Sequence, residues 1–311
     1  MPEGIRDVRA YYWLAKFITG FRIETIAMVA GYVFSFQSFY LDRKYELKSF
    51  MTKKFKRLIL PALFFGVFYY FIFMYDANNF NAIKFIVRLF SGVGHLWFLP
   101  MLFWLYLFIW IIDHYKIKSM LFVVSLAIIS IVPIPIALPF GLGKFFHFAF
   151  YGYLGYAMFQ HKDVLKRFIT RKHIILLITI YVISVYVNYQ YIIVEGGDMS
   201  LYAKIINRFT ANSISFISTM SGIFALYLIV INFTDNKGIV PHNWVIESSK
   251  ICYGVYVFHQ FILIYLYYHT FFPMIMGTYW MPIVGFIVTI IVSIILVSIT
   301  LRTKFGRFLI G

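Results

Sequence analysis

The chain has 311 residues, of which 62% are hydrophobic, 22% aromatic and only 13% charged. Soluble globular proteins have about 45–50% apolar and about 25% charged residues, so this composition excludes a protein whose main solvent is water. A net charge of +16 would suggest a nucleic-acid partner for a soluble protein. Here the cations lie between long apolar runs, which is typical of membrane proteins. We therefore expect the partner of this chain to be a lipid bilayer and not nucleic acid.

Nine apolar segments follow one another along the chain, and we predict that each forms a helix. A helix needs about 20 apolar residues to cross a bilayer, and a helix satisfies all its backbone polar groups in lipid. The predicted fold class is all-α: a polytopic membrane helix bundle of about nine transmembrane helices, in one domain over residues 1–311 with no soluble domain. The segments cover residues 23–41, 58–75, 95–112, 119–139, 145–160, 174–193, 211–232, 247–268 and 281–301.

Positive charges gather at alternate ends of these segments. Seven Lys and Arg residues lie at 43–57, five at 161–173 and three in the C-terminal tail. By the positive-inside rule these ends face the cytoplasm, which predicts a multi-pass protein of the plasma membrane. The opposite ends are expected to face outward, and they carry Asp76, Glu195, Asp198 and the Pro-rich turn at 133–139.

The same assignment places the N-terminus outside, although residues 1–24 carry four cations and do not resemble a cleavable signal peptide. One more helix before residue 1 would remove this conflict, because ten spans place both ends in the cytoplasm. We therefore expect the domain to be N-terminally incomplete.

Five stretches combine apolar segments with characteristic polar residues. They are FRIETIAMVAGYVFS (21–35), FMTKKFKRLILPALF (50–64), GHLWFLPMLFW (94–104), YGYLGYAMF (151–159) and SSKICYGVYVFHQFIL (248–263). Together they resemble the membrane-bound acyltransferase family 3, and the stretch at 94–104 is the most specific match. Members of that family have ten transmembrane helices and move acyl groups, usually acetyl, from a cytoplasmic thioester donor onto saccharides.

One part of the family pattern is missing. The family's first helix carries an Arg and, about ten residues later, a His regarded as the catalytic base. Here the resemblance begins with the family's second helix at Phe21, and no histidine precedes His95. The resemblance therefore implies a truncated start or a degraded gene copy that lacks the base, and an inactive truncated acyltransferase is one alternative.

The basic segment before the second apolar run suggests a binding site for the acyl donor. Lys54 and Arg57 are one helical turn apart and match the family's basic-x-x-Arg pattern, so the resemblance implies that they bind the phosphates of acyl-CoA. The alternative is that they serve topology and anionic lipid. The family also has an Arg where Arg22 stands, which implies a catalytic role for Arg22; the alternative is a cation snorkelling at the outer interface.

Histidine and aromatic residues supply the remaining candidates. His95 is a candidate base or hydrogen-bond donor, and Trp97 a wall for a sugar ring or a member of the interfacial aromatic belt. In the eighth segment Tyr253, Tyr256 and His259 recur at three-residue intervals. Such a polar stripe faces protein or a water-filled cavity, so the hypothesis is a catalytic role for Tyr253 and His259 and substrate binding for Tyr256; the alternative is interhelical hydrogen bonding.

His147 begins the fifth segment, where it is placed to line a cavity. No histidine spacing of the metal-ligand type such as H-E-x-x-H occurs, so no metal site is predicted. The single cysteine, Cys252, excludes an intrachain disulfide.

The resemblance and these residues together predict a bacterial inner-membrane O-acyltransferase. Its co-substrate is an acyl-CoA, with acetyl-CoA as the leading candidate, and its acceptor is a hydroxyl of a cell-envelope glycan or exopolysaccharide; no permanently bound cofactor is expected. The sugar hydroxyl is a weak nucleophile, so a histidine must take its proton during attack on the thioester. A lipid-linked glycan flippase or permease is the main alternative, and a purely structural membrane subunit is a third.

Overall fold

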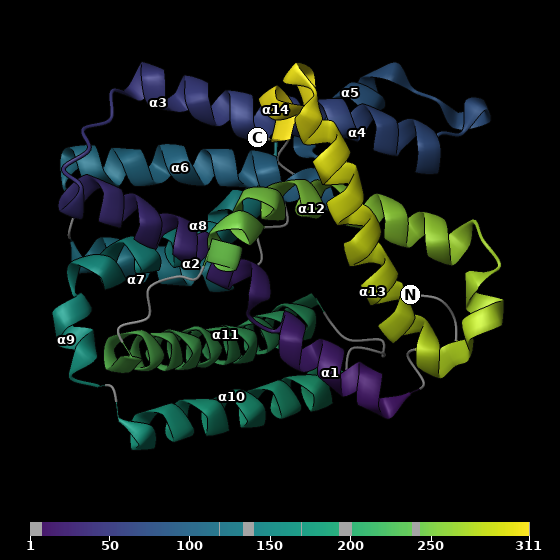
Figure 1. Ribbon diagram of the computed structural model, residues 1–311. Helices are drawn as coiled ribbons and strands as arrows, with labels where there is room; N and C mark the ends of the chain where they lie inside the picture. The colour runs from purple at the N-terminus through teal and green to yellow at the C-terminus, as the bar shows by residue number, and fades with distance from the viewer. Residues whose placement is uncertain are drawn as a thin grey trace.

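The computed structural model describes residues 8–117, 119–132, 140–168, 170–192, 201–237 and 243–310, and within them the chain is helical apart from short connections (Figure 1). The α-helices are α1 (Arg9–Thr19), α2 (Arg22–Ser35), α3 (Leu47–Lys54), α4 (Leu60–Phe73), α5 (Ala82–Ser91), α6 (Phe98–Tyr115), α7 (Met120–Ile131), α8 (Leu142–Gln160), α9 (Lys162–Lys166), α10 (Arg171–Ile192), α11 (Leu201–Lys237), α12 (Asn243–Tyr268), α13 (Phe272–Arg302) and α14 (Lys304–Ile310). The π-helical turns are η2 (Phe36–Tyr40) and η3 (Phe55–Ile59), and the 3₁₀ turns are η4 (Ala77–Asn79) and η5 (Gly94–Trp97).

Seven helical stretches within the described residues are long and apolar enough to cross a membrane. They confirm the prediction of an all-α polytopic membrane bundle. The stretches are Arg9–Tyr40, Leu47–Phe73, Gly94–Tyr115, Arg171–Gln190, Lys204–Phe233, Ile251–Tyr268 and Phe272–Arg302.

The two other predicted spans form helices that differ from these seven. α7 has 12 residues, which is too few to cross a bilayer by itself. α8 has 19 residues, of which ten are buried against other helices. Because α8 faces protein more than lipid, it can carry glycines, tyrosines, Lys144 and His147 where a lipid-facing helix would carry apolar residues.

The centre of the bundle is the crossing of α2 and α8, which depends on glycine. A Cβ atom on Gly31 would lie 1.9 Å from the carbonyl oxygen of Gly152, and one on Gly155 would lie 1.8 Å from that of Met28. Only glycine, which has no Cβ atom, lets the two backbones approach this closely, as in other membrane helix pairs with small residues at their interface. The Gly-rich motif at 151–159 is therefore a packing motif.

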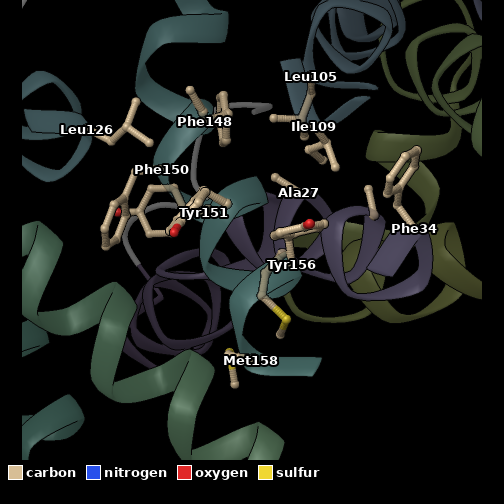
Figure 2. Packing of buried hydrophobic residues seen from close by; sticks show 14 of the residues in the cluster. Ala27, Phe34, Leu105, Ile109, Leu126, Phe148, Phe150, Tyr151, Tyr156 and Met158 are labelled. Atoms are coloured by element: carbon tan, nitrogen blue, oxygen red, sulfur yellow. The ribbon is translucent and has the colours of Figure 1, made fainter. Parts of the chain in front are cut away.

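Large apolar side chains surround this crossing (Figure 2). α2, α6 and α8 contribute most of them, and the labelled residues of these helices include Ala27, Phe34, Leu105, Ile109, Tyr151 and Tyr156. The core thus joins three helices that are far apart in the sequence, and it forms one wall of the cavity described below.

Residues 9–19, for which no span was predicted, form the helix α1. It lies beside α10 (Figure 1). The Trp13 ring stacks on that of Tyr186 of α10, with 6.0 Å between the ring centroids. The Tyr181 hydroxyl donates a hydrogen bond to the carbonyl of Phe17. The segment contains two cations, Arg9 and Lys16, and lacks a long apolar run, so its aromatic contacts with α10 are not visible from composition.

The helix ends are held by polar contacts. At the end expected to be cytoplasmic, Asp113 of α6 accepts hydrogen bonds from Ser38 at 3.0 Å and from Tyr156 at 2.8 Å, which ties η2 and α8 to α6. At the opposite end, a hydrogen bond from the Asn79 side chain and another from the Asn78 backbone N–H hold the pKa of Asp76 below its usual value. Glu195, Asp198 and the turn at 133–139, all predicted to face outward, lie outside the described residues.

Candidate active site

A cavity of about 550 Å³ lies between α2, the α3–η3 segment, α6 and α12. Four of the predicted site residues line it: Lys54, Arg57, Tyr253 and Tyr256. The wall is otherwise largely apolar, with Gln37, Tyr106 and Cys252 as its further polar or polarisable side chains. The cavity therefore combines a cationic end, meaning the part formed by Lys54 and Arg57, with a largely apolar wall.

A π-helical turn shapes the cationic end. α3, η3 and α4 form one uninterrupted helix from Leu47 to Phe73, and η3 carries Arg57 within it. A π turn inserts an additional residue into an α-helix and is frequent at functional sites. Gln37 lies in the other π turn, η2, so both π turns supply a polar residue to the same cavity.

Pro61 explains the contact between this segment and α12. In an α-helix the N–H of residue 61 would donate to the carbonyl of Arg57, but proline has no N–H. The Tyr253 hydroxyl donates to that carbonyl instead, at 2.7 Å. The hydroxyl of Tyr253 thus positions Arg57 against α12, which is the interhelical role that the sequence left open.

Lys54 and Arg57 carry positive charge without compensation by an acidic residue. The Lys54 ammonium lies 3.5 Å from the centroid of the Tyr106 ring and 5.3 Å from that of Phe50, so it makes cation–π contacts. Arg57 is exposed, and no carboxylate of the described residues forms an ion pair with either cation. An anionic ligand would supply the missing negative charge.

Two histidines lie together beyond Tyr256. The rings of His95 and His259 are 5.1 Å apart between centroids. Nε2 of His95 lies 3.1 Å from the carbonyl oxygen of Val257, and Nδ1 of His259 lies 2.7 Å from that of Tyr256. A carbonyl oxygen only accepts, so each of these nitrogens carries a proton.

This arrangement leaves one ring nitrogen of His95 without a hydrogen-bond partner. When the ring is neutral, Nδ1 holds a lone pair, and Nδ1 is buried without a hydrogen-bond partner. The hydroxyl of Tyr256 donates to the carbonyl oxygen of His95 at 2.7 Å, and the ring of Tyr256 lines the cavity. Tyr256 therefore stands between the cavity and the histidine pair.

The structure does not bring Arg22 and Trp97 to the cavity wall. Arg22 is the exposed first residue of α2. The ring of Trp97 packs near Phe148, with 5.9 Å between centroids, and the Lys144 ammonium lies 3.6 Å above it. The ring face to which a sugar was expected to stack is thus covered by Lys144 in this structure.

Sequence reasoning missed Gln37 and Tyr106. Gln37 accepts a hydrogen bond from the Tyr45 hydroxyl at 2.6 Å. Gln37 and Tyr106 are polar side chains within apolar runs. That property was their only signal, and the abundance of tyrosine elsewhere in the chain conceals it. Within the described part of the chain, no cluster of three or more His, Cys, Asp or Glu residues is arranged to hold a metal ion.

A family model described as an acyltransferase domain, that of acyltransferase family 3, matches residues 2–302. The chain belongs to this acyltransferase family. The match begins at residue 2, so the similarity of this acyltransferase to its family includes α1 and not only the chain from Phe21 onward. α1 itself carries no histidine. No curated protein and no solved structure gave a match.

Proposed function

We propose that this membrane acyltransferase transfers an acyl group, with acetyl from acetyl-CoA as the leading candidate, to a hydroxyl of a cell-envelope or exopolysaccharide glycan in a bacterial inner membrane. The observation that carries the proposal is the cavity lined by Lys54, Arg57 and Tyr256, because the ring of Tyr256 also contacts the rings of His95 and His259 on its other side. The two cationic side chains, the apolar wall and the neighbouring imidazoles suit the donor phosphates, the acyl-thioester arm and the proton transfer, respectively.

The cationic end suits the head group of the donor. Coenzyme A carries phosphate groups, which bind guanidinium and ammonium groups through charge-assisted hydrogen bonds. Arg57 is exposed, and neither Arg57 nor Lys54 is neutralised by a carboxylate of the described residues. The apolar wall beyond them would hold the uncharged acyl-thioester arm away from water.

His95 is proposed as the base. The acceptor hydroxyl oxygen attacks the thioester carbonyl, and Nδ1 of His95 takes the hydroxyl proton. The C–S bond then breaks, the thiolate of coenzyme A leaves, and the imidazolium returns the proton to the sulfur while the new ester remains on the glycan. Nδ1 is buried behind Tyr256, so this proposal requires the Tyr256 side chain to turn aside when both substrates are bound.

The other predicted residues take supporting parts in this scheme. The Tyr253 hydroxyl positions Arg57 by donating to its backbone carbonyl. The Tyr256 hydroxyl holds the backbone of His95 in the same way until the substrates bind, and His259 adjoins His95 as a second group for the proton. Arg22 and Trp97 lie outside the cavity wall, so their predicted roles have no place in it.

The test is transfer of radiolabelled acetyl from acetyl-CoA to membrane glycan by the purified protein in proteoliposomes. Arg57→Ala should raise the donor KM about 10-fold or more, since hydrogen bonds to charged groups contribute about 1.5–3 kcal/mol each. Lys56→Ala is the matched control: this residue lies in the same π turn and is exposed, but it does not line the cavity.

An unchanged donor KM in Arg57→Ala, with both variants inserted in the membrane at wild-type level, would contradict the donor site. Movement of unlabelled glycan across the bilayer without label transfer would support the flippase hypothesis instead.

A further inference from the structure

A second, smaller cavity lies between α7, α8 and α11. Its volume is about 160 Å³, and its polar lining residues are Ser130, His147, Tyr151, Asn212 and Ser215. It shares no lining residue with the first cavity. The ends of α7 and α8 that meet here adjoin the 133–139 turn, which the charge pattern predicts to face outward.

Two of the lining residues are fixed by the carbonyl groups at the end of α7. Nδ1 of His147 lies 2.9 Å from the carbonyl oxygen of Ser130, and the amide nitrogen of Asn212 donates to that of Ile131 at 2.8 Å. The last carbonyls of a helix lack partners within it, so these contacts cap α7. They also hold the imidazole and the amide rigidly at the cavity.

Glu24 of α2 adds a carboxylate to this arrangement. Its Oε1 lies 3.4 Å from Nε2 of His147. The Glu24 carboxylate thus contacts the imidazole that lines the cavity.

The chemistry of the wall selects the class of ligand. The described residues that line the cavity include no lysine or arginine, which disfavours phosphate groups, and their polar side chains disfavour an acyl chain. Asn212 keeps its amide oxygen as an acceptor, and Ser215 makes no hydrogen bond with the described residues. Hydroxyl, amide and imidazole groups beside the aromatic ring of Phe216 suit a neutral ligand with several hydroxyls.

We propose that this cavity binds one sugar ring of the acceptor glycan, on the outer side of the membrane and separate from the acyl-donor cavity. This inference rests on the proposed function for the identity of its ligand. α2 lies between the two sites, because Glu24 contacts His147 of the second cavity and Ile26 lines the donor cavity. The acceptor would thus be held on one face of α2 and the donor on another.

The test is saturation-transfer NMR on the purified protein in detergent, with methyl α-glucopyranoside, methyl α-galactopyranoside and N-acetylglucosamine as separate probes. Ser215→Leu places a branched side chain into the cavity and should reduce the ring-proton signal of the bound probe at least fivefold. Ser213→Leu is the matched control, because Ser213 lies two residues away on α11, bonds back to the Phe209 carbonyl and does not line the cavity.

Ser215→Ala keeps the test valid if the larger substitution prevents folding. It removes only the hydroxyl and should weaken binding about twofold to tenfold, the effect of one hydrogen bond. The proposal is overturned if none of the three probes gives a signal with the wild-type protein. It is also overturned if the Ser215 and Ser213 variants bind equally.

Binding of acetyl-CoA, measured by calorimetry on the same samples, separates this proposal from the proposed function. Sugar binding without acetyl transfer would count against the acyltransfer reaction alone. The sugar site alone would be contradicted if Ser215→Leu binds the sugar as the wild type does while acetyl transfer and acetyl-CoA binding persist.

Discussion

The glycine-dependent crossing of α2 and α8 leads to a sharp prediction for Gly155→Ala. The added Cβ would lie 1.8 Å from the Met28 carbonyl oxygen, whereas Cβ contacts under 3.0 Å essentially do not occur. The atoms must therefore separate by at least 1.2 Å (3.0 − 1.8). The obstacle is helix backbone, so it cannot move away as the end of a side chain can, and α2 must shift relative to α8.

Such a shift disturbs the packing of the surrounding buried residues. Overpacking a core typically costs about 1–3 kcal/mol, and we expect a value at or above the upper end because the whole helix pair must separate. Alanine is favoured over glycine in a helix by about 1 kcal/mol, which offsets only part of that cost. The predicted net loss in the free energy of unfolding is about 2 kcal/mol or more.

The assay is unfolding of the purified protein in detergent micelles by titration with sodium dodecyl sulfate, followed by circular dichroism. Gly66→Ala is the control: its Cβ would lie 3.0 Å from Cδ1 of Leu89, the end of a flexible side chain. We expect Gly66→Ala to unfold within about 1 kcal/mol of the wild type. Equal stability of Gly155→Ala and Gly66→Ala would refute the argument that backbone contact at this crossing determines the stability of the bundle.

Two further predictions concern the histidine pair and the hydrogen bonds to Asp113 at the end of α6. His95→Gln should lower kcat for acetyl transfer about 100-fold or more, which is the usual contribution of a general base. His269→Gln changes an exposed position and should retain activity. Comparable kcat values for the two variants would exclude His95 as the base. Tyr156→Phe removes one of two hydrogen bonds to the Asp113 carboxylate. It should lower the free energy of unfolding by about 1.5 kcal/mol, measured by the same detergent titration. A stability equal to that of the wild type would show that the Ser38 hydroxyl alone satisfies the carboxylate.

Local properties of the sequence were sufficient for the bundle and for part of the cavity. Lys54 and Arg57 lie three residues apart, and Tyr253 and Tyr256 repeat that spacing on α12. Helical periodicity places such pairs on one face of a helix, so the sequence was sufficient to expect the two members of each pair side by side. It could not predict that both pairs line the same cavity, because that depends on how α3–η3 packs against α12.

Long-range contacts decided which of the remaining candidates join the cavity. The Tyr253 hydroxyl meets the Arg57 carbonyl across 196 residues of sequence, and a signal for it was present in Pro61, four residues after Arg57. Nothing in the sequence near Trp97 indicates that Lys144 covers its ring.

The sequence by itself determined the class of this protein: an all-helical membrane bundle of the acyltransferase family, with its cations at alternate helix ends. Those features follow from hydrophobicity, periodicity and charge, which are properties of single segments and need no partner. Only the tertiary structure decided the α2–α8 crossing, the burial of Nδ1 of His95 without a hydrogen-bond partner and the separation of the two cavities. Each depends on contacts between helices distant in the sequence, and such contacts are set by how complete surfaces fit together.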